Sequence, residues 1–244
     1  MDSISISAAS GMRARMESLE MLANNLANVE TGGFKADREF YSIYTGEEAT
    51  IDPRTGVAAA QPVIESQWTD HSQGNLRNTS NPLDFAIDGE GFFAVQTPGG
   101  IRYTRNGSFR VSQAGIVTMI DGSPVIAKGG GQIALQPNLP VELSAEGVLS
   151  QDGQPAGQFD LVSFDAGAVG KAGLNYFAPR EGAKPRAAAG TVLQGKVEQS
   201  NVGAAESAVR LVAIMRQFEM LQKAMNIGNE LNRRAIEEVA RVAA

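Results

Sequence analysis

The residues that could bind a metal ion gather in one short stretch, LDFAIDGEG, which contains Asp84, Asp88 and Glu90. Their carboxylates could bind a hard cation, but their spacing does not match a calcium-binding EF-hand loop. Asp88–Gly91 is instead typical of a tight turn between two strands. We therefore favour a turn, with no metal and no cofactor, and keep a cation site at these carboxylates as the alternative.

The other chemically active groups are isolated in the sequence. His71 is the only histidine, and a general base needs a partner that its neighbours do not supply, so we expect a surface loop residue. Gly129–Gly131 is followed by neither a helix pattern nor a Lys-Ser/Thr pair, which excludes a phosphate-binding loop. The chain has no cysteine and no GxSxG or HExxH motif. The sequence thus predicts no catalytic residues and no enzyme.

A cluster of amides stands near the N-terminus, where residues 23–34 read ANNLANVETGGF. Asn24, Asn25 and Asn28 occupy the end of an apolar helical stripe. Two interpretations remain open. The amides could face neighbouring helices and penalise wrong registers, as a buried Asn does in a coiled coil. They could instead cap the helix end locally.

Apolar residues near the N-terminus follow steps of three and four, which predicts a helix over about residues 4–29. Glu30–Gly33 is expected to end this helix, since glycine suits a left-handed cap. The stripe, widened by Met21 and Leu22, consists of Ser5, Ala9, Met12, Met16, Leu19, Ala23 and Leu26.

The C-terminus shows the same spacing and predicts a helix over about residues 202–241, capped by Ser200 or Asn201. A second apolar stripe on this helix runs through Met220, Ala224, Ile227 and Leu231. The first stripe consists of Leu211, Ile214, Phe218, Leu221, Met225 and Gly228, and it resumes at Ala235 and Val239.

The middle of the chain alternates short apolar runs with turns, which is typical of an antiparallel sandwich or barrel-like domain. Asn106–Gly107 and Asp121–Gly122 are two-residue hairpin signals. We predict an α+β fold with a mainly β centre, in which the terminal helices pair as a coiled coil. The expected segments are an N-terminal helix (1–33), an extended linker (34–75), a β-rich domain (76–180), a return connection (181–200) and a C-terminal helix (201–244).

Each terminal helix is apolar on more than one face, so a single helix pair would leave apolar surface uncovered. That surplus could pack on the chain's own sheet or on other subunits. The net charge of −6 argues against nucleic acid as a partner. We expect no membrane insertion and no cleaved signal, because the sequence shows no spanning apolar run and its N-terminus lacks a signal-peptide pattern.

Four motifs, in order along nearly the whole chain, resemble bacterial flagellar rod and hook axial proteins. They are SGMRARMESLEMLANNLANVETGGFKAD (residues 10–37), GNLRNTSNPLDFAIDGEGFFAVQTPGGIRYTRNGSF (74–109), LQGKVEQSNV (193–202) and RQFEMLQKAM (216–225). The length is typical of a rod protein and too short for the hook protein. Within the family the chain is most similar to proximal rod proteins, with a distal rod subunit as the alternative.

The resemblance implies export through the flagellar type III apparatus without cleavage, and polymerisation in the periplasm into the rod that transmits torque from motor to hook. It implies neighbouring proximal and distal rod subunits as partners. From another class, a ligand- or metal-binding β domain on helical tethers stays open. The expected assembly residues are Met12, Met16, Leu19, Leu22, Asn24, Asn25, Leu26, Asn28, Leu211, Ile214, Phe218, Leu221, Met225 and Leu231.

Overall fold

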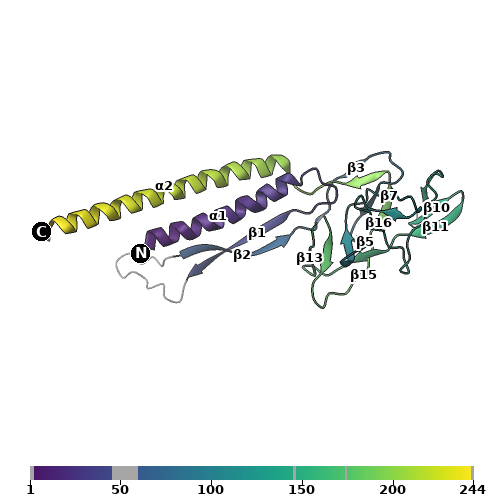
Figure 1. The fold of residues 1–244 in the computed structure, drawn as a ribbon, viewed down its shortest axis with the longest axis horizontal. Helices are drawn as coiled ribbons and strands as arrows, with labels where there is room; N and C mark the ends of the chain where they lie inside the picture. Colours follow the sequence, from purple (N-terminus) through teal and green to yellow (C-terminus); the bar gives the residue numbers. More distant parts are fainter. Residues whose placement is uncertain (1–2, 46–59, 145–146, 174, 243–244) are drawn as a thin grey trace. The chain divides into compact units, whose positions relative to one another are not determined.

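The computed structural model describes residues 3–45, 60–144, 147–173 and 175–242, and the chain divides into two compact units (Figure 1). The helical unit comprises the described parts of Met1–Ala27, Asp37–Trp68 and Gly203–Ala244. The β unit comprises Asn28–Ala36 and the described parts of Thr69–Val202. The chain therefore enters the β unit directly after its first helix and leaves it directly before its last.

The helical unit contains helices at both ends of the chain, α1 (Ser3–Ala27) and α2 (Ala204–Val242). They lie side by side and run in opposite directions (Figure 1). The predicted helices are confirmed, with ends within two residues of those expected. The α+β class with a mainly β centre is confirmed as well.

The face of α1 that is buried in the helical unit differs from the predicted apolar stripe. It consists of Gly11, Ala14, Ser18, Met21, Leu22 and Asn25. A Cβ atom at Gly11 would lie 3.5 Å from Leu221 Cδ1, so α2 passes close to α1 at this point. Small side chains let the two helix backbones approach, and the Ser18 hydroxyl is satisfied by donating to the Ala14 carbonyl at 2.9 Å.

The predicted α1 stripe is largely turned away from this seam. Met16 is 49% exposed, and Ala9 and Ala23 are exposed as well. Met12, Leu19 and Leu26 are half-buried. The side chain of Ser5 lies outside those that the structure describes, as do Ala235 and Val239 of α2. Of the residues predicted for the stripe, only Met21 and Leu22, which widen it, lie on the buried face, and small residues form much of the rest of that face.

The segment expected as an extended linker, residues 34–75, contains paired strands of the helical unit. These are β1 (Asp37–Thr45) and β2 (Ala60–Thr69), which run in opposite directions and form a two-stranded sheet (Figure 1). β1 packs on α1. An isolated pair of strands is marginally stable in water, so packing against the helix provides the support that the pair needs.

The β unit is built on a six-stranded sheet with the strand order β13-β14-β6-β5-β12-β15. Smaller sheets pair β11-β10-β9, β16-β4, β17-β3 and β7-β8. Every residue register described for these pairs is antiparallel, as expected. The strands of the unit are β3 (Leu76–Asn78), β4 (Phe85–Asp88), β5 (Phe92–Thr97), β6 (Gly100–Thr104), β7 (Arg110–Val111), β8 (Val117–Thr118), β9 (Glu142–Leu143), β10 (Val148–Gln151), β11 (Gln154–Gln158), β12 (Leu161–Ser163), β13 (Val169–Lys171), β14 (Phe177–Pro179), β15 (Arg186–Ala187), β16 (Thr191–Gln194) and β17 (Lys196–Glu198).

Strand β5 explains why the unit has two cores. Side chains alternate between the two faces of a strand, so consecutive apolar residues bury both faces. Phe93 and Val95 belong to the larger core, which includes the rings of Phe85, Phe109 and Phe159. Phe92 and Ala94 belong to a smaller core on the opposite face, together with Tyr103, Val162, Val169 and Phe177.

The two predicted hairpin turns have different outcomes. Asp121–Gly122 forms a tight turn, in which Gly122 has a φ of 85° and donates to the Met119 carbonyl at 3.0 Å. The hairpin predicted at Asn106–Gly107 is wrong, because β6 pairs with β5 and β14 and not with β7. Gly107 instead lies against β4, where its carbonyl accepts from the Phe85 amide at 2.9 Å. Long-range packing overrides the local turn signal here.

Gly107→Ala is expected to destabilise the β unit by about 3 kcal/mol or more, because the added methyl meets backbone that cannot move aside. Its Cβ would lie 1.7 Å from the Phe85 carbonyl oxygen. Gly131→Ala is the matched control, since open space surrounds that position. Urea denaturation followed by circular dichroism measures both variants, and equal transition midpoints would contradict the predicted clash.

Candidate functional site

Within the β unit, the segment that follows α1 in sequence is hydrogen-bonded to the segment that precedes α2. The Gly33 amide donates to the Glu198 carbonyl at 2.7 Å, and the Ala36 amide donates to Asn201 Oδ1, also at 2.7 Å. The Asn201 amide nitrogen Nδ2 donates to the Asp70 carbonyl at 2.8 Å. We call this region, formed by residues 28–36, 69–75 and 196–202, the junction. It fixes the distance between the points where the two chain ends leave the β unit.

A buried ion cluster joins two junction residues, Lys35 and Glu198, to Arg105, which lies outside the junction segments. Lys35 Nζ lies 2.5 Å from Glu198 Oε1, and Arg105 Nη1 lies 3.2 Å from Glu198 Oε2. The side chains of Lys35 and Glu198 are fully buried, and that of Arg105 is 5% exposed. Two further hydrogen bonds come from the cations, since Lys35 Nζ donates to the Ser72 carbonyl at 2.7 Å and Arg105 Nη2 to the Gly89 carbonyl at 2.8 Å.

Such a cluster stabilises a specific arrangement more than it adds net stability. Removing buried charges from water costs several kcal/mol for each ion, and only well-placed partners offset that cost. Burial lowers the pKa of Lys35, and the nearby Glu198 carboxylate opposes this by favouring the charged form. The partners come from three distant parts of the chain, so only the native junction satisfies all of them. We infer that the cluster selects this one junction geometry.

Backbone segments pack closely around the ion cluster. Two residues that were expected to cap helices, Gly33 and Asn201, lie in this packing instead. Gly33 has a φ of 68°, but α1 ends at Ala27, so Gly33 is not the cap of that helix. A Cβ at Gly33 would lie 2.4 Å from the Asn106 nitrogen. Asn201 was expected as a possible cap of α2, but its amide is used inside the junction. Both residues therefore form contacts between segments that are far apart in the sequence.

His71 packs beside the cluster and not in an exposed loop. Its ring centroid lies 5.2 Å from that of Phe177 and 5.7 Å from that of Phe92. Burial is the main cause that lowers the pKa of His71 to about 4, and the positive charges of Lys35 and Arg105 lower it further. The imidazole is therefore neutral at pH 7 and occupies an apolar position.

The pH dependence of stability follows from this pKa. The unfolded chain has a histidine pKa near 6.5, so between about pH 6.5 and pH 4 it binds a proton that the folded chain does not. The contribution of His71 is full above pH 6.5 and is lost as pH falls toward 4. We expect a loss of about 1 to 2 kcal/mol, allowing for partial solvent screening. Urea midpoints measured across this range should fall less steeply for His71→Gln, and parallel curves would contradict the assignment.

The three amides at the end of α1 have different surroundings. Asn25 is buried, and its side chain donates to the Asp37 carbonyl at 2.8 Å and accepts from the Asp37 amide at 3.0 Å. Asn28 accepts a hydrogen bond from the Thr31 hydroxyl at 3.2 Å, which closes a local turn. Asn24 is exposed. Asn25 thus binds the end of α1 to the start of β1 inside the helical unit.

Asn25→Leu is expected to destabilise the packing of β1 on α1, because it leaves both backbone groups of Asp37 without their amide partner. The cost should be about 2 kcal/mol. Asn24→Leu, one residue away and exposed, is the matched control. Hydrogen exchange at the Asp37 amide measures the effect directly. Unchanged protection in Asn25→Leu would show that these two hydrogen bonds contribute little.

The predicted assembly residues of α2 fall into two groups. Ile214 is buried, and Leu211, Phe218, Leu221 and Met225 are half-buried, on the face that packs within the helical unit. Leu231 is 61% exposed and belongs to a second, uncovered face. We call this face the outer stripe, and its residues, all exposed, are Val209, Ala213, Met220, Ala224, Ile227 and Leu231.

The outer stripe leaves large apolar side chains in water. Val209 is 73% exposed, Met220 61% and Ile227 60%. Single exposed apolar residues are normal on protein surfaces, but a run at helical spacing over most of a helix marks an interaction site. None of the described helices is long and apolar enough to cross a membrane.

The acidic residues considered for metal binding do not converge. Asp84 is buried, whereas Asp88 and Glu90 are exposed at the turn after β4. Among the described residues there is no group of three acidic, histidine or cysteine side chains that could bind a metal ion. The turn predicted at Asp88–Gly91 is present, and Gly89 and Gly91 both have a positive φ.

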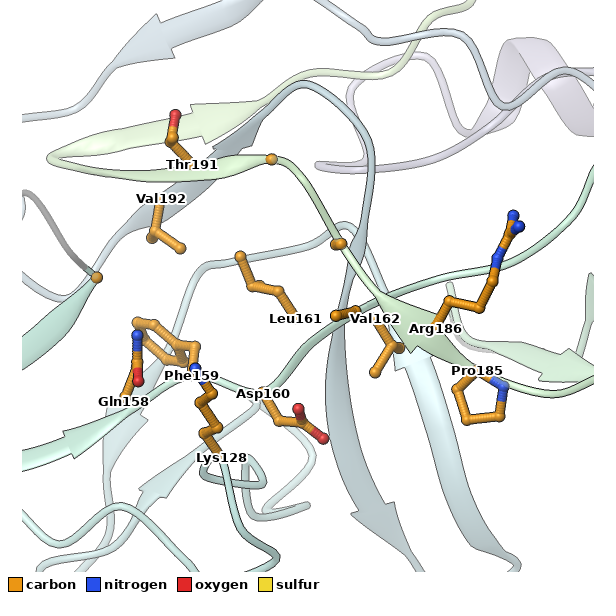
Figure 2. A pocket seen from close by; sticks show the side chains of 14 residues that line it. Lys128, Gln158, Phe159, Asp160, Leu161, Val162, Pro185, Arg186, Thr191 and Val192 are labelled. Atoms are coloured by element: carbon orange, nitrogen blue, oxygen red, sulfur yellow. The ribbon is translucent and has the colours of Figure 1, made fainter.

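A cavity of about 360 Å³ opens beside β12 (Figure 2). Leu161, Val162 and Val192 give it apolar walls. The ionisable groups in its described lining are Lys128, Asp160 and Arg186. This set contains no nucleophile paired with a base, so it does not indicate a catalytic centre.

Sequence reasoning missed the junction entirely. Lys35 and Glu198 are 163 residues apart, and no local pattern connects them. A weak signal was present, since Lys35 stands directly between the apolar residues Phe34 and Ala36. A charge in such a setting needs a buried partner, but the sequence does not identify which one.

The terminal segments and the β centre each match a protein-family model. Residues 7–35 match the model described as "Flagella basal body rod protein", and residues 193–238 match "Flagellar basal body rod FlgEFG protein C-terminal". Residues 86–154 match "Flagellar hook protein FlgE/F/G D1 domain". The first two matches cover most of the described helices and extend into two of the three junction segments.

The helices from the two ends of the chain pack on each other, and the β unit is inserted between them in the sequence. This arrangement defines the class of protein to which the chain belongs. Flagellar basal-body rod protein FlgF of Caulobacter vibrioides is 33% identical over 92% of each chain. FlgF of Escherichia coli is 34% identical over 84% of this chain and 85% of its own. FlgG of Buchnera aphidicola subsp. Schizaphis graminum is 32% identical over 91% and 94%. The chain belongs to the flagellar basal-body rod protein family.

Proposed function

We propose that the chain is a structural subunit of the flagellar rod that polymerises through its terminal helices. The observation that carries this proposal is the outer stripe of α2, which stays exposed while a different face of the helix packs within the helical unit. A helix with an uncovered apolar face is stabilised by burying that face. Repeated burial of one subunit's stripe on a different surface of the next produces a helical filament.

In the rod, α1 and α2 pair as a coiled coil and form the inner layer, with the outer stripe turned toward neighbouring subunits. The steps of three and four between Leu211, Ile214, Phe218, Leu221 and Met225 support coiled-coil pairing. The half-buried Met12 and the exposed Met16 of α1 add flexible apolar side chains that adapt to non-identical neighbours.

We propose that the chain occupies the proximal part of the rod. FlgF proteins from Caulobacter vibrioides and Escherichia coli, at 33% and 34% identity, support it. The FlgG protein at 32% identity favours the distal rod as the second candidate. Replacing the chromosomal FlgF or FlgG gene of the host bacterium with the gene for this chain distinguishes the two. Restored motility in the FlgF-deficient strain alone supports the proximal position.

We further propose that the chain reaches the periplasm through the flagellar type III export apparatus without cleavage. The resemblance of residues 10–37 to the N-terminal signature of axial proteins supports this route. Mass spectrometry of the chain recovered from basal bodies tests it. The first residues should be intact, and a cleaved N-terminus would refute the proposed route.

A deletion of Gly203–Ala244 tests the proposed function as a whole. The deletion starts after Asn201 because that residue belongs to the junction. The β unit should keep its circular dichroism signal, and the truncated chain should be absent from purified basal bodies. Retention in basal bodies would show that the β unit carries the main subunit contacts.

A further inference from the structure

The methionines of the chain differ in their access to water. The chain has eight methionines and no cysteine, so thioethers are its only sulfur groups. Met220 is 61% exposed, which is the largest exposure among the described methionines, whereas Met21 is 8% and Met119 is 4% exposed. Met16 and Met215 are 49% and 48% exposed. An oxidant in solution therefore reaches the sulfur atom of Met220 most readily.

Hydrogen peroxide oxidises a methionine thioether in a single two-electron step. The sulfur lone pair attacks one peroxide oxygen, so that an S–O bond forms and the O–O bond breaks. The departing oxygen takes up the proton of the transferred oxygen and leaves as water. Methionine is oxidised to methionine sulfoxide and the peroxide is reduced. The side chain thereby exchanges an apolar sulfur for a polar S=O group.

The position of Met220 on the outer stripe determines what this change does. Its neighbours four and seven residues further along the helix, Ala224 and Ile227, are apolar. No residue of the outer stripe has a side-chain hydrogen-bond donor for a sulfoxide oxygen. In the monomer, water satisfies that oxygen. Burial against another apolar surface would leave it without a partner, which opposes association.

We propose that Met220 is an oxidation site at which peroxide prevents the unassembled subunit from entering the rod. The proposal rests on the proposed function, because only assembly buries the outer stripe. The thioether reacts while it is exposed in the monomer, and it is protected once a neighbouring subunit covers it. A methionine sulfoxide reductase reverses the step and returns the subunit to the competent form.

Met215 provides an internal reference for this site. It lies five residues before Met220 on α2, which places it about 140° away around the helix axis. Its side chain is exposed, so peroxide oxidises it as well, but it lies outside the outer stripe. A sulfoxide at Met215 should therefore leave incorporation unchanged. The comparison separates oxidation of the stripe from oxidation of the helix in general.

Peptide mass spectrometry of the purified full-length chain tests the oxidation site itself. Hydrogen peroxide is added, and the fraction of each methionine that has gained one oxygen atom is followed over time. Met220 should be oxidised at least about fivefold faster than the buried Met21 and Met119, while the helical circular dichroism stays unchanged. Equal rates at Met220 and Met119 would overturn the proposal and leave the proposed function intact.

Substitution by leucine tests the effect of oxidation on assembly. Each gene is induced in the presence of low hydrogen peroxide, in a strain that lacks the protein, and the amount of the chain in purified basal bodies is measured. Met220→Leu keeps an apolar side chain of similar size that peroxide does not oxidise. Under peroxide it should be incorporated at least about threefold more than the wild type, and equally without peroxide. Met215→Leu should behave as the wild type in both conditions.

Met220→Gln is the opposite variant, because it carries a permanent polar group of similar length at the same position. Its incorporation should be low even without peroxide. Normal incorporation of Met220→Gln, or equal incorporation of Met220→Leu and the wild type under peroxide, would overturn the proposal and leave the proposed function intact. Absence of the wild-type chain from basal bodies without peroxide would refute the proposed function itself.

Discussion

Glu198→Gln is expected to destabilise the β unit by about 3 to 5 kcal/mol, which is the cost of leaving buried charges without their counterion. Lys35 and Arg105 both depend on this one carboxylate, and both side chains are buried. The glutamine has nearly the same size, so lost packing contributes little. The measurement is the urea midpoint of the full-length chain, followed by circular dichroism.

The location of the effect is as informative as its size. The Gly33 and Ala36 amides donate to groups of the junction, so hydrogen exchange at these two positions should accelerate in Glu198→Gln. Asp165→Asn is the control, since it breaks an ion pair whose side chains are 60% and 77% exposed and should have little effect. A variant as stable as the wild type would show that the cluster does not hold the junction.

The double substitution Met220→Glu and Ile227→Glu is expected to abolish incorporation into the rod while the monomer stays folded. Both positions lie on the outer stripe and are about 60% exposed, so charges there are well solvated in the monomer. In a subunit interface the same carboxylates would be buried without partners. That costs several kcal/mol at every contact, and the cost repeats along the filament.

A matched control variant separates the effect of the position on the outer stripe from the effect of the added charge. Gln222→Glu with Asn226→Glu adds the same two negative charges to exposed positions outside the outer stripe. This control should restore motility in a strain that lacks the protein, whereas the stripe variant should not. Helical circular dichroism of both purified chains checks folding. Equal motility of the two variants would remove the outer stripe from the proposed interface.

The elements of the fold that depend on local pattern could be predicted from the sequence. Steps of three and four identified α1 and α2 almost to the residue, since helical periodicity is a local property. The short apolar runs between turns likewise indicated strands, of which Phe92–Thr97 is one. The Asn106–Gly107 hairpin failed because its backbone is held by β4, a partner that local turn chemistry does not reveal.

The packing face of α1 and the junction could not be predicted for a related physical reason. Gly11, Ala14 and Ser18 pack because they are small, and a hydrophobicity pattern gives them little weight. His71 was expected on the surface, but it is neutral and lies between aromatic rings. Lys35 and Glu198 are 163 residues apart, so their pairing depends on the topology of the whole β unit.

The accessibility of one thiol on the outer stripe tests the central claim most directly. Ile227→Cys places the only cysteine of the chain at an exposed position. Its reaction rate with a maleimide is measured in the purified monomer and in intact basal bodies. The account predicts fast labelling in the monomer and strong protection in basal bodies, because assembly buries the outer stripe. Equally fast labelling in both would show that the stripe remains in water, and it would contradict assembly through this face of α2.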